Sequence, residues 1–266
     1  MAFRERYGPW ALIAGASEGI GAAYAHEAAR RGLDVVLVAR GREKLDATAA
    51  SVAAIGVRVH VAEIDLASDD VVARLDEAVG DREIGLFVYN ACHSVIGEFL
   101  DLSEADRERT IDVNVRAMTR LAAAHGAKMT ARRRGGIVLM SSLSGLQGTA
   151  MVGIYAATKA YTTTLGEVLW EELGRSGVDV LTVIAGATLT PNFMAQTPEA
   201  VRATAYPGEP DVVACEGLDH LGRGPLWVPG AINRAVYHAV RHLMPRRAAV
   251  RFFSSNTRKM YDRGDS

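Results

Sequence analysis

The sequence predicts an α/β fold in which one doubly wound parallel sheet lies between two layers of helices. Six apolar runs of strand length alternate with longer segments of helical pattern, and this alternation is typical of parallel strands joined by helical crossovers. The chain has 266 residues, of which 49% are hydrophobic, and this content can cover both faces of such a sheet. We therefore expect residues 1–266 to form a single domain with three layers.

The expected elements follow one another in the order that right-handed crossovers require. The strands are the apolar runs at residues 10–14, 34–39, 57–64, 84–90, 136–141 and 178–184. The helices are the patterned segments at residues 19–31, 42–54, 69–79, 103–130 and 155–173. Ser103 marks a helix start, because its side chain can cap a first turn that also carries Glu104 and Asp106.

The alternation breaks down in the segment 188–229, where six prolines interrupt short helical pieces. A mobile substrate lid has this composition, and so does an irregular surface insertion. The sequence leaves both interpretations open.

Composition limits the classes of partner and compartment. Thirty basic and 31 acidic residues leave a formal charge of −1, which argues against a nucleic-acid partner. The only cysteines are Cys92 and Cys215, so the sequence predicts no disulfide framework and no metal site. No signal core or membrane span is recognisable. We expect a soluble, cytoplasmic protein that binds a small molecule.

A glycine-rich turn directly follows the first expected strand and opens a helix. Gly15, Gly19 and Gly21 are spaced differently from the GxGxxG fingerprint but occupy the same strand-turn-helix context. Backbone N–H groups in such a turn point at an anion. We therefore expect a dinucleotide pyrophosphate to bind the residues of this turn, which are Gly15, Ser17, Glu18, Gly19, Ile20 and Gly21. A tight turn without a ligand is the alternative.

Arg40 and Asp65 predict which dinucleotide binds. Arg40 follows the second strand, where an NAD-binding domain would carry an acidic residue for the ribose 2′-hydroxyl. A guanidinium can instead donate two hydrogen bonds to a 2′-phosphate, so we expect NADP, with Arg42 or Lys44 assisting. The alternative is that Arg40 is simply solvated. Asp65, before Leu66, can accept a hydrogen bond from adenine or cap the next turn, and these roles are compatible.

Tyr155 and Lys159 lie four residues apart in an expected helix and therefore share a face. An ammonium ~4 Å from a phenol, at an effective dielectric of ~20, supplies roughly the 4 kcal/mol that moves the phenol pKa toward neutrality. This pair predicts a proton donor and acceptor, although the spacing alone also arises by accident.

Taken together, these motifs resemble those of the short-chain dehydrogenase/reductase family over about the first 190 residues. The match consists of Gly15, Gly19, Gly21, Asp65, Asn90, Asn114, Ser142, Tyr155 and Lys159, in this order. The resemblance implies a Rossmann-type fold and hydride transfer between NADP(H) and a substrate carbon. It also implies that Tyr155 is the acid or base, that Lys159 lowers its pKa and binds the nicotinamide ribose, that Ser142 binds the substrate oxygen, and that Asn114 holds a relay water. Ser141 is expected to be structural.

The resemblance also implies cofactor contacts beyond the glycine turn, from Asp65, Leu66, Asn90, Ala91, Tyr155, Lys159, Gly186, Thr188 and Thr190. Two positions depart from the family pattern. Cys92 replaces a glycine, and we expect it to pack as a small buried side chain. Ala185 replaces a proline, which leaves cofactor affinity open. We expect His93 to be a partly exposed loop residue that can line the pocket.

The sequence therefore predicts an NADP-dependent carbonyl reductase or alcohol dehydrogenase that acts on a hydrophobic ketone or alcohol. An apolar pocket could form from Met151, Val152, Leu189, Phe193, Met194 and Trp227. The alternatives are a non-catalytic dinucleotide-binding regulator and a nucleotide-sugar epimerase. The resemblance further suggests a homodimer or homotetramer paired through the helices that begin near Ser103 and Tyr155.

Two basic segments have simple structural explanations. Residues 132–134 are three arginines at a helix end, where we expect a solvated cap. Residues 246–253 mix basic and aromatic side chains. A terminal helix docked on its own domain is the preferred interpretation of this segment, and a membrane or partner contact is the alternative.

Overall fold

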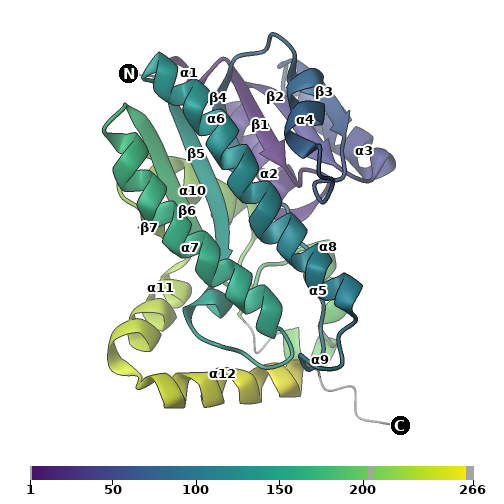
Figure 1. Ribbon diagram of the computed structural model, residues 1–266, viewed down its shortest axis with the longest axis vertical. Helices are drawn as coiled ribbons and strands as arrows, with labels where there is room; N and C mark the ends of the chain where they lie inside the picture. The colour runs from purple at the N-terminus through teal and green to yellow at the C-terminus, as the bar shows by residue number, and fades with distance from the viewer. Residues whose placement is uncertain (1, 203–205, 262–266) are drawn as a thin grey trace.

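The computed structural model describes residues 2–202 and 206–261, and its strands form one parallel sheet (Figure 1). The strands are β1 (Trp10–Ala14), β2 (Asp34–Ala39), β3 (Val59–Glu63), β4 (Ile84–Tyr89), β5 (Gly135–Ser142), β6 (Val178–Ala185) and β7 (Leu226–Trp227). Their spatial order is β3-β2-β1-β4-β5-β6-β7. The predicted doubly wound fold is confirmed, and only the two-residue β7 has no predicted counterpart.

Helices cover both faces of the sheet. They are α1 (Phe3–Tyr7), α2 (Gly19–Arg30), α3 (Arg42–Ala53), α4 (Val71–Val79), α5 (Glu104–Ile111), α6 (Met118–Arg132), α7 (Gly153–Gly174), α8 (Pro191–Gln196), α9 (Glu199–Arg202), α10 (Pro210–His220), α11 (Ala231–His238) and α12 (Arg246–Tyr261). Successive strand side chains point to opposite faces. Ile13 of β1 therefore packs in the core beneath α2, α3 and α10, whereas Leu12 packs in the core beneath α4, α6 and α7.

The predicted helix at residues 103–130 consists of three parts. Ser103 caps α5 as expected, because its hydroxyl accepts a hydrogen bond from the backbone N–H of Asp106. A π-helical turn, Asp112–Ala117, then separates α5 from α6. Such turns are frequent at functional sites, and this one carries Asn114.

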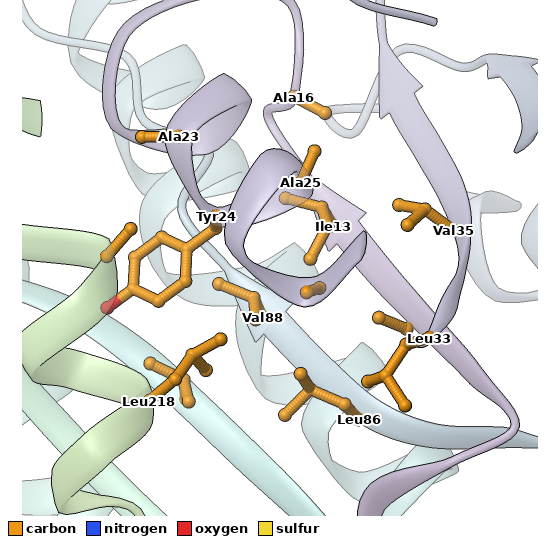
Figure 2. Packing of buried hydrophobic residues seen from close by; sticks show 14 of the residues in the cluster. Ile13, Ala16, Ala23, Tyr24, Ala25, Leu33, Val35, Leu86, Val88 and Leu218 are labelled. Carbon is orange, nitrogen blue, oxygen red and sulfur yellow. The ribbon is translucent and has the colours of Figure 1, made fainter. Parts of the chain in front are cut away.

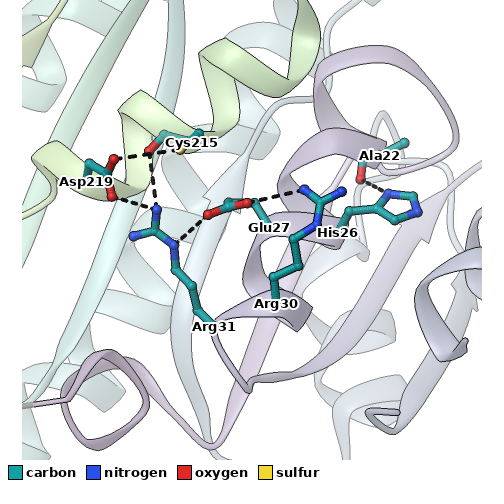
Figure 3. A network of polar contacts seen from close by, with 7 residues as sticks. All are labelled: Ala22, His26, Glu27, Arg30, Arg31, Cys215 and Asp219. Carbon is teal, nitrogen blue, oxygen red and sulfur yellow. Dashed lines mark hydrogen bonds and ion pairs between the residues drawn. The ribbon is translucent and has the colours of Figure 1, made fainter. Parts of the chain in front are cut away.

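Helix α10 belongs to the core layer, although it lies within the predicted lid segment. Tyr24 of α2 is fully buried and points toward Leu218 of α10 (Figure 2). At the surface, Arg31 donates hydrogen bonds to Glu27 at 2.9 Å and to Asp219 of α10 at 2.7 Å (Figure 3). The prolines of this segment therefore delimit a packed helix. Only residues 188–202 of the predicted lid border the carboxyl edge of the sheet.

The three arginines at the end of α6 are more than a solvated cap. Arg133 adopts a left-handed conformation with φ of 53° and ends the helix. Arg132 donates a hydrogen bond of 2.8 Å to the carbonyl of Ile84, and Arg134 forms an ion pair with Glu83. Arg132 and Arg134 therefore connect the end of α6 to the start of β4.

Helix α12 docks on its own domain, which confirms the preferred interpretation of the basic-aromatic segment. Ala249 is 2% exposed, and the backbone N–H of Ala150 donates a hydrogen bond of 3.1 Å to the Ser254 hydroxyl. Within residues 2–202 and 206–261, none of the helices combines the length and the apolar character that a membrane crossing requires.

A buried histidine makes the stability of this fold sensitive to acid. His125 of α6 is 2% exposed and lies against Phe87, with ring centroids 4.8 Å apart. Burial, followed by the charge of Lys128, lowers the pKa of His125 to about 4. The unfolded chain, with a histidine pKa near ~6.5, therefore binds the proton more tightly than the folded chain.

We expect the contribution of His125 to the free energy of unfolding to be constant above about pH 6.5 and to fall by roughly 3 kcal/mol as the pH decreases toward about 4. Urea unfolding of wild type and of His125→Gln, at neutral and acidic pH, measures this contribution. The variant should lose less stability in acid than wild type does. Equal losses in the two proteins would show that His125 does not cause the acid sensitivity.

Candidate active site

The candidate site lies at the carboxyl ends of β1 and β4, where the strand order reverses and open parallel sheets bind their ligands. The glycine turn after β1 is held against the end of β4. The Asn90 side chain donates a hydrogen bond of 2.9 Å to the Gly15 carbonyl. Gly15 has a φ of +84°, and a Cβ there would lie 2.6 Å from the Ala91 backbone. Glycine is therefore required at this position.

The start of α2 fits a phosphate group. Glu18, at the N-cap of α2, makes no capping hydrogen bond with its side chain, and its carboxylate instead pairs with Lys44 at 2.6 Å. The first N–H groups of the helix, beginning at Gly19, are therefore available to an anion. A Cβ at Gly19 would lie 2.9 Å from the methyl group of Thr190, so the segment after β6 borders this turn.

Arg40 is exposed at the end of β2, next to two cations that are already paired. Arg42 lies 2.8 Å from Asp46, and Lys44 is held by Glu18. Arg40 forms no ion pair within the described parts of the chain. Of the three predicted phosphate ligands, it is therefore the one that makes no ion pair there, although its charge helps to lower the pKa of Asp65.

Asp65 caps the turn after β3, as one of its two predicted roles requires. Its Oδ1 accepts a hydrogen bond of 3.0 Å from the Ala67 N–H, and Arg109 donates to both carboxylate oxygens at 3.0 and 2.9 Å. Burial acts to raise the pKa of Asp65, but the hydrogen bonds from Arg109 and Ala67 outweigh it and lower the pKa. The adenine contact of Asp65, and with it a cofactor contact of the neighbouring Leu66, remains a prediction.

The structure brings Ser142, Tyr155 and Lys159 together. Ser142 ends β5, and the other two residues lie in the first two turns of α7. Tyr155 lies close enough to Ser142 for the serine hydroxyl to act on the pKa of the phenol. The Lys159 ammonium donates a hydrogen bond of 2.7 Å to the Met140 carbonyl and lies 5.5 Å from the centroid of the Tyr155 ring. The neighbouring Ser141 hydroxyl donates to the Lys159 carbonyl at 2.8 Å, which confirms its structural role.

The sequence predicted that Lys159 lowers the pKa of Tyr155. This prediction is wrong when only the groups of the protein act on the phenol. Burial raises the pKa of Tyr155, and the charge of Cys92 adds to this effect, while the nearby Ser142 hydroxyl opposes it. Burial also lowers the pKa of Lys159, which weakens the influence expected from its charge. The sequence spacing revealed the pair, but it could not reveal how deeply the pair is buried. A phenol with a raised pKa stays protonated at neutral pH, so it carries a proton to donate, but it is a weaker acid than the pattern predicted.

This direction of the pKa shift predicts a flat pH profile for any reaction in which Tyr155 donates the proton. Because the phenol stays protonated, kcat should be nearly constant between about pH 6 and pH 9. A phenol with a pKa near 7 would instead lose about tenfold in kcat for each pH unit above 7. Steady-state kcat at saturating substrate, measured across this range, distinguishes the two cases.

Asn114 fixes the loop after β4. Its side chain is 2% exposed; Oδ1 accepts a hydrogen bond of 2.7 Å from the His93 N–H, and Nδ2 donates to the His93 carbonyl at 2.9 Å. Nδ2 also donates to the Thr158 hydroxyl at 3.0 Å. Asn114 therefore positions this loop against α7, and its role in holding a relay water remains a prediction.

The loop after β4 corrects one expectation and confirms another. Cys92 is exposed rather than buried, because Asn114 holds the next residue on both sides and leaves the thiol outside the core. It lies close enough to Tyr155 and Lys159 for its charge to raise both pKa values. The His93 side chain is 23% exposed, as expected of a partly exposed loop residue, and its Nε2 lies 3.9 Å from Asp106.

The segment after β6 forms the other side of the site. Thr188 is buried and donates a hydrogen bond of 3.1 Å to the Gly186 carbonyl. The Thr190 hydroxyl caps α8 by accepting a hydrogen bond of 3.2 Å from the Phe193 N–H. The Trp227 indole stacks on His220 of α10 with centroids 3.3 Å apart and donates a hydrogen bond of 2.8 Å to Glu216, and its place in an apolar pocket remains a prediction.

Two residues at the site were missed by the sequence reasoning. Arg109 of α5 binds Asp65, as described above, and Tyr261 of α12 acts electrostatically on Tyr155. Neither residue lies in a recognisable motif, and both reach the site from elements whose packing the sequence pattern does not fix.

The chain matches known proteins over most of its length. The family model described as short chain dehydrogenase matches residues 9–200. A 7beta-hydroxysteroid dehydrogenase of Clostridium sardiniense is 35% identical over 235 residues, which cover 88% of this chain and 90% of that protein. A very-long-chain 3-oxoacyl-CoA reductase of Mycosarcoma maydis is 35% identical over 177 residues, or 64% of this chain and 51% of that protein.

Solved structures agree with these matches. A structure from work on 7beta-hydroxysteroid dehydrogenase stereoselectivity superposes with a TM-score of 0.90 at 28% identity, covering 95% of this chain and 99% of the other. A short-chain dehydrogenase from Sphingobium yanoikuyae in complex with NADPH has a TM-score of 0.78 at 34% identity, covering 88% of this chain and 92% of the other.

Proposed function

We propose that this chain, which belongs to the short-chain dehydrogenase/reductase family of oxidoreductases, is an NADPH-dependent reductase of a hydrophobic ketone. The observation that carries the proposal is the position of Tyr155. This half-buried, protonated phenol lies beside Ser142 at the carboxyl end of β5. Family membership makes the cofactor a nicotinamide dinucleotide, and the expected preference for NADP(H) favours the reductive direction.

We infer that the cofactor is NADP(H). Arg40 supports this choice, because its guanidinium is free to bind a 2′-phosphate while Arg42 and Lys44 are paired with acidic side chains. The turn from Gly15 to Gly21 would hold the pyrophosphate. Asn90, Ala91, Gly186, Thr188 and Thr190 would border the rest of the cofactor. An NADPH complex of a structure that is 34% identical gives further support.

Each of the protein side chains at the site would have a separate role in the reaction. When bound, the nicotinamide supplies a hydride to the carbonyl carbon of the substrate. Tyr155 donates its phenolic proton to the carbonyl oxygen, and Ser142 donates a hydrogen bond to the same oxygen. Lys159, held by the Met140 carbonyl, would bind the ribose and help to return a proton to Tyr155. Asn114 keeps the loop after β4 in place beside them.

The substrate class that we propose is an oxosteroid. Relatives that align over about nine-tenths of both chains are named 7beta-hydroxysteroid dehydrogenases, and the region beside Tyr155 contains apolar side chains. Val152 is buried, Met151 precedes it, and Phe193 and Met194 lie on α8. Such a surface suits a large apolar ring system.

The test is a spectrophotometric assay of NADPH consumption with three substrate groups: 7-oxosteroids, small aliphatic ketones and 3-oxoacyl thioesters. Our proposal expects the highest kcat/KM for an oxosteroid. NADPH binding without turnover of any of these compounds would favour a non-catalytic dinucleotide-binding regulator. Turnover of 3-oxoacyl thioesters alone would retain the chemistry but refute the substrate class.

Three further expectations concern the whole molecule. We propose that residues 1–266 act as one domain, with residues 188–202 as the substrate lid. We also propose that copies pair through α7, whose outer face exposes the side chains of Tyr161 and Val168. A cytoplasmic location suits the two free cysteines.

A further inference from the structure

Helix α12 crosses the carboxyl-edge side of the fold, below the ends of α7 and α9 in Figure 1, and contacts segments that border the candidate site. Ser254 binds the backbone of Ala150, between β5 and α7. Arg258 donates hydrogen bonds of 3.0 and 2.8 Å to Glu98, in the loop after β4. The Gly97 N–H in turn donates to the Met151 carbonyl at 2.8 Å. These contacts fix the helix over the substrate side of the site.

The helical period places Tyr261 on the inner face of α12. Ser254, Arg258 and Tyr261 are separated by four and three residues and therefore lie along one side of the helix. Phe252 lies on a different side and is 54% exposed. Because Ser254 and Arg258 both bind segments that border the site, the Tyr261 side chain points toward the site as well.

Two observations show what Tyr261 approaches. Burial is the main cause of the raised pKa of Tyr155, and Tyr261 makes a smaller contribution in the same direction, which agrees with the position of Tyr261 on the inner face of α12. Burial likewise raises the pKa of Tyr261, and the hydroxyl of Thr197, just after α8, opposes this effect. Thr197 is 2% exposed, and its hydroxyl is not in hydrogen-bond geometry with any residue in the described ranges.

We propose that Tyr261 is a specificity-determining residue that closes the substrate side of the site and, with Thr197, binds a second hydroxyl or oxo group of the substrate. This inference rests on the proposed function. The Tyr261 ring offers an apolar surface to the body of a rigid multi-ring ketone, and its hydroxyl offers a polar contact at one end. A buried hydroxyl without a partner is unfavourable, so a substrate hydroxyl beside Thr197 would satisfy it.

The experiment compares Tyr261→Ala, Tyr261→Phe and Thr197→Val with wild type. The substrates are a 7-oxosteroid that carries one further hydroxyl, the corresponding steroid without it, and a small aliphatic ketone. Phe252→Ala is the matched control, because it removes an aromatic ring from the outer side of the same helix. The readouts are KM, kcat and the Kd of NADPH.

Tyr261→Ala should raise KM for both steroids by about tenfold, because an apolar contact is lost. KM for the small ketone and the Kd of NADPH should not change. Tyr261→Phe and Thr197→Val should each raise KM by about fivefold for the hydroxylated steroid only, which corresponds to one lost hydrogen bond. Phe252→Ala should behave like wild type.

Different results would refute this inference and the proposed function. If wild type reduces oxosteroids and the Tyr261 variants match it in KM for all substrates, only the role of Tyr261 is refuted. A parallel loss of NADPH affinity would show a structural role instead. If wild type reduces no ketone, the proposed function fails. Equilibrium binding of the hydroxylated steroid to the protein with NADP⁺ then decides this inference, which requires about tenfold weaker binding by Tyr261→Ala.

Discussion

Replacing Tyr155 with phenylalanine is expected to lower kcat for ketone reduction by about 100- to 10,000-fold, the usual contribution of a positioned proton donor. The ring remains and only the hydroxyl is lost, so the fold and the Kd of NADPH should be unchanged. The residual rate would reflect binding of the two reactants in one site. Steady-state kinetics with NADPH and the best oxosteroid, together with NADPH binding, measures both quantities.

Tyr161→Phe is the matched control, because it removes a phenolic hydroxyl from the same helix. Tyr161 is 39% exposed, and its hydroxyl lies 2.9 Å from that of Thr119 on α6, away from Ser142. This variant should keep the wild-type kcat. If Tyr155→Phe retains the wild-type rate, the proposed proton transfer is wrong. If both variants lose activity equally, the loss reflects damage to α7 rather than missing chemistry.

Replacing Arg40 with serine is expected to weaken NADPH binding by about 100-fold, because two charge-assisted hydrogen bonds to the 2′-phosphate are lost. NADH binding should change little, since NADH carries no 2′-phosphate. Titration of wild type and variant with each nucleotide, followed by the change in protein fluorescence, gives the four Kd values.

Arg42→Ala serves as the control for a general loss of positive charge. Its guanidinium is held by Asp46, so its removal should affect NADPH binding much less than Arg40→Ser does. Tighter binding of NADH than of NADPH by wild type would refute the assignment of Arg40. An equal loss from both variants would point to long-range electrostatics instead of a direct phosphate contact.

Local patterns predicted the fold of the region that we propose binds the cofactor. Gly15 illustrates why. Its φ of +84° and the close approach of Ala91 leave room only for glycine, so the residue type itself indicates the backbone conformation. The buried strands β1, β2 and β4 are equally apparent, because a parallel strand covered on both faces is apolar at every position. The Tyr155–Lys159 pair follows from helical spacing alone.

Properties that depend on packing were not predictable in the same way. The pKa of Tyr155 is set first by its burial, which a residue spacing does not reveal. Cys92 was expected inside the fold but is exposed, because Asn114 anchors the adjoining backbone from a π-helical turn. Helix α10 was not predicted, because prolines interrupt the sequence pattern around it, although Leu218 packs in the core with Tyr24 of α2. In each case, partners distant in sequence decide the outcome.

The most direct test of the central claim follows the hydride and not the consumption of NADPH. Wild-type protein is incubated with a 7-oxosteroid and NADPH that carries deuterium at both positions of the nicotinamide C4, and the product is analysed by mass spectrometry and NMR. If Tyr155 and Ser142 hold a ketone for reduction, the hydroxysteroid will carry one deuterium on the new carbinol carbon, and Tyr155→Phe will form almost none of it. Unlabelled product, or no product while NADPH is bound, would contradict the account.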